Sequence, residues 1–201
     1  MSRLRLSFYI AFLAFSTVPI YYFGFRGLTA FKVPTGSMIP TLLPGDFIFA
    51  LPADEYRRGD IVVARDPLDP GAYIVKRIVG MPGDTVEVNY GYLSIDGQYA
   101  SEPYLREPCA YVLEPEPVPA GEILLLGDNR NESDDASRWL IDPDTGTAID
   151  ATRLQSNIVE GKRWKRTVPL DTVIGKVVYR YLPIGRAGPV RSFPLTNLAG
   201  E

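Results

Sequence analysis

The sequence predicts a mainly β, antiparallel and barrel-like domain that follows one N-terminal transmembrane helix. Eighteen glycines and eighteen prolines among 201 residues make turns frequent and long helices unfavourable. Short apolar runs separated by such turn residues are typical of strands in an antiparallel sheet. One uncharged run near the N-terminus is far longer than the others, and it predicts the helix.

That run, residues 6–25, is bounded by Arg5 and Arg26. At the helical rise it covers about 30 Å, the thickness of the hydrocarbon core of a bilayer. Arg3 and Arg5 precede it, so the positive-inside rule places the N-terminus in the cytoplasm. A cleaved secretory signal would have a shorter apolar region, and flanking arginines argue against a buried core helix. The predicted organisation is a cytoplasmic tip at 1–5, a transmembrane anchor at 6–25 and an extracytoplasmic β-rich domain at 27–201.

The elements of this domain follow from alternating apolar runs and turn signals. Seven runs are predicted strands: 47–51, 61–64, 73–79, 85–88, 92–95, 122–126 and 173–181. Turns between them are predicted from Pro-Gly-Asp at 44–46 and 82–84, Arg-Gly-Asp at 58–60 and Asp-Gly at 96–97.

Three other segments are predicted to be irregular. Residues 27–32 form a short link, and residues 103–120 have the proline-rich and glutamate-rich composition of a loop. Residues 141–169 are polar and weakly patterned, and they are a possible insertion. The basic stretch at 162–166 could contact lipid headgroups, although a solvated loop is the favoured interpretation.

Composition excludes several functions. A formal charge of −3 gives no general attraction to nucleic acid, so no nucleic-acid partner is predicted. The chain has no histidine, which removes Ser-His-Asp and Cys-His catalysis and histidine-ligated zinc. The single cysteine, Cys109, cannot form an internal disulfide and is interpreted as a bystander thiol. Any general base must therefore be Lys, Asp, Glu or Tyr.

A candidate nucleophile lies in the segment 33–42, Val-Pro-Thr-Gly-Ser-Met-Ile-Pro-Thr-Leu, a few residues beyond the anchor. Gly36 lets the backbone come close to a substrate and leaves the amide of Ser37 free to donate, while the prolines stiffen the loop. Met38 is apolar where a loop is normally polar, so we expect it to line a substrate groove or a lipid-facing surface. On these residues alone, an ordinary turn is equally compatible.

A candidate base lies in the segment 73–84, Tyr-Ile-Val-Lys-Arg-Ile-Val-Gly-Met-Pro-Gly-Asp. In a strand, Lys76 shares one face with Ile74 and Ile78, where desolvation disfavours the charged amine. Acting as a base at neutral pH requires the pKa to drop by about 3 units, or roughly 4 kcal/mol. Arg77, on the other face, is expected to be solvated or ion-paired. The alternative is a strand-edge lysine whose ammonium reaches water.

The third segment, 124–138, is a buried strand followed by a loop dense in Asp, Asn, Ser and Arg. Such a loop can be held rigid by hydrogen bonds and Asp–Arg pairs, so Asp128 and Arg130 are predicted braces. The spacing of its acidic residues does not match a calcium-binding EF-hand loop, and no metal or other cofactor is predicted.

Together the three segments resemble the type I signal peptidases, the bacterial serine–lysine enzymes that remove signal peptides. The matching boxes are Ser-Met-Ile-Pro-Thr-Leu at 37–42, Lys-Arg-Ile-Val-Gly-Met-Pro-Gly-Asp at 76–84 and Gly-Asp-Asn-Arg at 127–130. The resemblance implies a signal-peptidase or repressor-peptidase type of catalytic domain with a shallow apolar groove. It also implies a single-pass protein of the bacterial inner membrane, a monomer whose partners are signal peptides and membrane lipid. The implied substrate has small side chains one and three residues before the cut.

The resemblance assigns roles to six residues: nucleophile Ser37, general base Lys76, oxyanion-hole donors Thr35 and the Ser37 amide, Ser133 as the residue that orients the lysine, and braces Asp128 and Arg130. One extra residue between Ser133 and Arg138 leaves the roles of Asp135, Ser137 and Arg138 open. The alternative function is that of a specialised or inactive paralogue serving as a membrane-anchored peptide-binding module. A self-cleaving repressor-type peptidase would need a DNA-binding domain that the sequence does not indicate.

Overall fold

The structure is a computed structural model that describes residues 7, 12, 13, 17, 18, 21, 24, 27–151 and 164–195. The predicted tip at 1–5 and most of the predicted anchor at 6–25 lie outside the described residues. Among those that are described, no helix is long and apolar enough to span a bilayer. The anchor and the position of the possible insertion at 141–169 therefore stay predictions.

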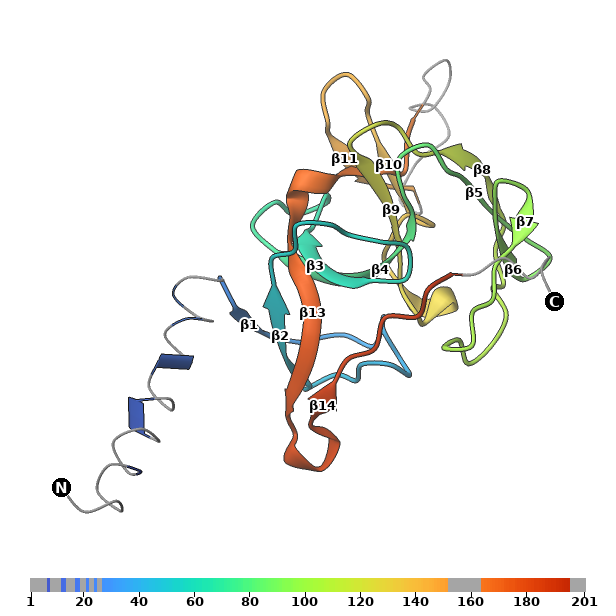
Figure 1. Cartoon of the computed structure of the whole chain (residues 1–201). Helices are drawn as coiled ribbons and strands as arrows, with labels where there is room; N and C mark the ends of the chain where they lie inside the picture. The colour runs from blue at the N-terminus through green and yellow to red at the C-terminus, as the bar shows by residue number, and fades with distance from the viewer. Residues whose placement is uncertain are drawn as a thin grey trace.

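The main sheet has eight strands and is antiparallel throughout. Its order is β1-β2-β13-β3-β4-β9-β12, with β14 paired to β13 (Figure 1). The strands are β1 (Thr29–Lys32), β2 (Phe47–Leu51), β3 (Ile61–Arg65), β4 (Tyr73–Gly80), β9 (Glu122–Leu126), β12 (Val168–Pro169), β13 (Val173–Leu182) and β14 (Gly188–Pro189). The sheet curls into a half-barrel, and β1 and β12 at its ends have no second partner strand among the described residues.

Two smaller sheets lie beside it. One has the order β7-β6-β5-β8, formed by β5 (Thr85–Asn89), β6 (Tyr92–Ile95), β7 (Gln98–Tyr99) and β8 (Leu113–Pro117). The other pairs β10 (Trp139–Ile141) with β11 (Ala148–Asp150). Three short 3-10 helices complete the described elements: Arg130–Glu132, Leu170–Thr172 and Ile184–Arg186.

The mainly β, antiparallel prediction is confirmed, and all seven predicted strands are present. The barrel-like prediction holds only in part, because the sheet stays open. Three segments predicted to be irregular contain strands: β1 lies in 27–32, β8 in 103–120, and β11 and β12 in 141–169. Strand β8 tolerates Pro115 and Pro117 because it is an edge strand, where a missing amide breaks no central ladder.

The core lies on both faces of the main sheet. Along β3, Val62 packs into one buried cluster that includes residues of the four-stranded sheet. Val63 packs into a second cluster with Met38 and Leu42. This alternation is the period of two that a strand imposes on its side chains. The second cluster fixes the loop between β1 and β2, which carries the candidate nucleophile.

Three predicted Gly-Asp turns share one hydrogen-bond pattern. The buried carboxylates of Asp46, Asp60 and Asp84 each accept the amide of the third residue before them. The donors and distances are Leu43 at 2.8 Å, Arg57 at 3.0 Å and Met81 at 2.8 Å. Each carboxylate also pairs with a basic side chain from another segment, so the turns hold distant strands in register.

Candidate active site

The loop from 33 to 42, which follows β1, carries Ser37. Leu42 donates to the Met38 carbonyl at 2.9 Å, and both side chains are fully buried. The expectation that Met38 lines a groove or faces lipid was therefore wrong, because this side chain anchors the loop in the core. Burial of these two residues leaves Ser37 little freedom to move.

The backbone around Ser37 is held by Asn129. The Asn129 amide donates to the Ser37 carbonyl at 2.9 Å, and its side-chain Nδ2 donates to the Gly36 carbonyl at 3.1 Å. In the trans peptide that joins Gly36 to Ser37, the Ser37 N–H points opposite to the Gly36 carbonyl. Because that carbonyl accepts the Asn129 side chain, the Ser37 N–H faces away from Asn129. Gly127 permits this approach, because a Cβ there would lie 2.5 Å from the Ser37 carbonyl oxygen.

Lys76 lies on β4 with only 3% of its surface exposed. Its Nζ lies 3.0 Å from Ser133 Oγ, in a hydrogen bond that the amine donates. The predicted burial of Lys76 is confirmed, and a strand-edge lysine that reaches water is excluded. The structure thus brings together two residues that are 57 positions apart in the chain.

Burial lowers the pKa of Lys76 below its ordinary value, because desolvation disfavours the ammonium form. Four carboxylates oppose this shift, in decreasing order Asp135, Asp134, Asp66 and Asp128. Desolvation is the larger effect, so the neutral amine gains population relative to a free lysine. An amine in this state can accept a proton.

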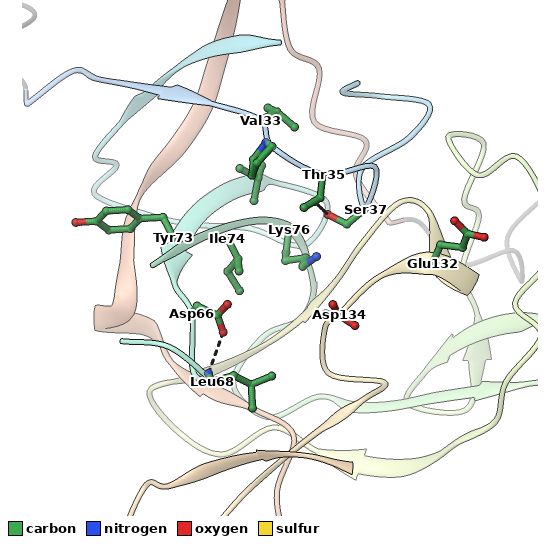
Figure 2. Close-up of a pocket in the computed structure, with 12 residues that line it drawn as sticks. Val33, Thr35, Ser37, Asp66, Leu68, Tyr73, Ile74, Lys76, Glu132 and Asp134 are labelled. Carbon is green, nitrogen blue, oxygen red and sulfur yellow. Dashed lines mark hydrogen bonds between the residues drawn. The ribbon is translucent and has the colours of Figure 1, made fainter. Parts of the chain in front are cut away.

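Ser37 and Lys76 line the same cleft (Figure 2). Its volume is about 200 Å³. Thr35 lies beside this candidate nucleophile, with its Oγ1 3.3 Å from Ser37 Oγ. The other lining residues are apolar or acidic: Val33, Pro34, Leu68, Tyr73, Ile74, Val75, Asp66, Glu132 and Asp134. The cleft therefore combines hydroxyl groups and an amine with apolar and acidic lining residues.

Asp128 and Arg130, the predicted braces, each form a buried ion pair, but not with each other. Asp128 accepts two bonds from Arg77, at 2.8 Å from Nε and 2.7 Å from Nη2, and both side chains are fully buried. Arg77 is therefore ion-paired rather than solvated. Arg130 pairs with Glu102 and donates from Nε to the Gly127 carbonyl at 3.1 Å. Nothing in the sequence pattern marked Glu102.

The residues that follow Ser133 have distinct structural roles. The Asp135 carboxylate accepts the Gly127 amide at 2.7 Å and the Ser137 amide at 2.9 Å, which closes the loop on itself. Arg138 pairs with Asp134 at 3.1 Å, and that pair is largely exposed. The extra residue is thus accommodated without displacing Ser133 from Lys76.

The family model described as "Signal peptidase, peptidase S26" matches residues 3–182. The chain belongs to this family. It is 31% identical over 172 residues to a probable signal peptidase I-1 of Synechocystis sp., covering 80% of this chain and 74% of that protein. It is 33% identical over 168 residues to a signal peptidase I of Leptolyngbya laminosa, covering 78% of this chain and 70% of that protein.

A solved structure overlaps in part. The signal peptidase I of Enterococcus faecalis V583 aligns with 49% of this chain and 92% of its own chain, at 28% identity and a TM-score of 0.39. The family assignment rests on the sequence matches.

Proposed function

We propose that this signal peptidase is a serine endopeptidase that removes signal peptides with Ser37 as nucleophile and Lys76 as general base. One observation carries this proposal: the buried Lys76 amine is hydrogen-bonded to Ser133, and Lys76 lines the same cleft as Ser37. The neutral amine takes the hydroxyl proton as Ser37 Oγ attacks the scissile carbonyl carbon. The resulting ammonium gives that proton to the leaving amine, and an acyl-enzyme forms. Water, deprotonated by Lys76, then releases the cleaved signal peptide.

The oxyanion of the tetrahedral intermediate would be bound by the Thr35 hydroxyl and the Ser37 amide. The position of Thr35 Oγ1, 3.3 Å from the attacking oxygen, supports this role. Fixed donors of this kind stabilise charge that develops only in the transition state. The carbonyls of Gly36 and Ser37 already accept bonds, so this peptide has little freedom to reorient.

The substrate would be an extended peptide with small residues one and three positions before the cut. A cleft of about 200 Å³ with Val33 and Ile74 in its wall supports small side chains over bulky ones. Binding by strand addition is the mode we infer, because Lys76 lies on a strand whose first half lines the cleft.

The membrane anchor at 6–25 would hold residues 27–201 outside the cytoplasm of a bacterial cell. This topology would place Ser37 a short distance beyond the bilayer surface, where an exported preprotein emerges. A reporter fused after Glu201 should behave as exported. Cytoplasmic activity of that fusion would overturn the topology.

Loss of preprotein processing on Ser37→Ala tests the proposal. The full-length chain is incubated with a preprotein in detergent, and the new N-terminus is sequenced. Ser94→Ala is the matched control, because Ser94 is also a buried serine but lies in the small sheet. Cleavage should be lost in the first variant and kept in the second. A parent protein that binds signal peptides without cutting them would instead favour the peptide-binding module.

A further inference from the structure

Tyr104 lies between β7 and β8, in the segment predicted as a loop, yet it is only 5% exposed. Its ring stacks on the guanidinium of Arg77, with 3.9 Å from Cζ to the ring centroid. Phe193, near the C-terminus, lies 5.8 Å from the same Cζ. A buried guanidinium gains from an aromatic face because its charge interacts with the ring quadrupole. Tyr104 therefore fixes the plane of Arg77.

The hydroxyl of Tyr104 contacts the second arginine system. It donates to Glu102 Oε1 at 2.6 Å and accepts from Arg130 Nη2 at 3.4 Å. Glu102 in turn accepts from Arg130 Nη1 at 2.9 Å. Burial raises the pKa of Tyr104 well above its ordinary value, so the phenol keeps its proton and remains a donor. One side chain thus touches both arginines.

These arginines hold consecutive residues of the loop 127–133, which carries Ser133. Arg130 donates to the Gly127 carbonyl, and Arg77 binds the Asp128 carboxylate. The next residue, Asn129, holds the backbone of Ser37, and the same loop continues to Ser133. Positions 127–133 therefore set where Ser133 meets the Lys76 amine.

We propose that Tyr104 and Glu102 are positioning residues for the serine–lysine site. They act through Arg77 and Arg130, which hold the loop so that the Lys76 amine stays bonded to Ser133 and shielded from water. This inference rests on the proposed function of the same site. Neither residue lines the cleft that Ser37 and Lys76 share.

Steady-state cleavage of a model preprotein by Tyr104→Leu, Tyr104→Phe and Glu102→Gln tests this role. Tyr104→Leu should lower kcat about 10- to 100-fold with KM changed less than about 2-fold, because a small displacement of catalytic groups is costly. Its pH profile should move to higher pH, since water reaching the amine raises the pKa of Lys76. Tyr104→Phe keeps the stacked ring and should lose less activity. Glu102→Gln should shift the profile in the same direction as Tyr104→Leu.

Tyr92→Leu is the matched control, because Tyr92 is a tyrosine on β6 of the four-stranded sheet whose surface is 56% exposed. It should keep the parent kcat and pH profile. Parent values in all three test variants, with Ser37→Ala inactive, would overturn the positioning role and leave the proposed function intact. A lower melting temperature with an unchanged pH profile would also overturn it. If Tyr104→Leu does not fold, Tyr104→Phe and Glu102→Gln decide the question.

Discussion

Asp128→Asn should destabilise the domain more than any ordinary surface substitution. Asparagine has nearly the same shape as aspartate, so the change removes the charge while leaving the packing. Arg77 and Asp128 are both 0% exposed, and the guanidinium would stay buried without a counter-charge. Removing one partner of a buried pair costs about 3–5 kcal/mol. For a domain of this size that corresponds to a melting temperature lower by about 6–20 °C.

Thermal unfolding followed by circular dichroism, at one fixed pH, measures this loss. Arg77→Met combined with Asp128→Leu should recover much of it, because two apolar side chains can replace a buried pair. Glu55→Gln is the control, since the Glu55–Arg57 pair is about 80% exposed and is expected to contribute less than about 1 kcal/mol. A melting temperature within about 2 °C of the parent for Asp128→Asn would refute the reasoning. So would a double variant that is less stable than the single one.

Three further predictions concern the chemistry, and each is read from the rate of preprotein cleavage. Thr35→Ala should lower the rate about 10²–10³-fold because it removes one oxyanion-hole donor, and Thr35→Ser should keep most of the parent rate because it keeps the hydroxyl. A full rate for the alanine variant would make Thr35 a turn residue. Burial lowers the pKa of Lys76 and Asp134 opposes that shift, so Asp134→Asn should move the rising limb of activity to lower pH. A move to higher pH would contradict this assignment. Replacing the alanine before the cut by phenylalanine should abolish cleavage, and equal cleavage would mean a wider pocket.

The seven predicted strands were found because each is an apolar run between strong turn residues. Strand β1 was missed because three of its four residues are exposed and its sequence, Thr-Ala-Phe-Lys, lacks a clear alternation. Strand β8 was missed because its two prolines indicate a loop, and only its place at a sheet edge makes them acceptable. Local sequence patterns do not reveal which strand lies at an edge.

For a related reason, some features of the site could be predicted from the sequence and others could not. The burial of Lys76 follows from alternation along one strand, which is local information. The pairs Arg77–Asp128 and Arg130–Glu102 join residues 51 and 28 positions apart, and only the fold brings them together. The interior position of Met38 likewise depends on strands that come later in the chain.

The pH dependence of kcat/KM for cleavage of a model preprotein tests most directly whether Lys76 is the base. The neutral amine is populated as the pH rises through its pKa, so activity should increase with pH. Because burial lowers that pKa, the midpoint should lie below the ordinary lysine value of about 10.4. Lys76→Arg should be inactive over the whole range, since guanidinium keeps its proton. A midpoint at the ordinary value, or comparable cleavage by Lys76→Arg, would contradict the account and move the search for the base to Asp128, Asp134 and Asp135.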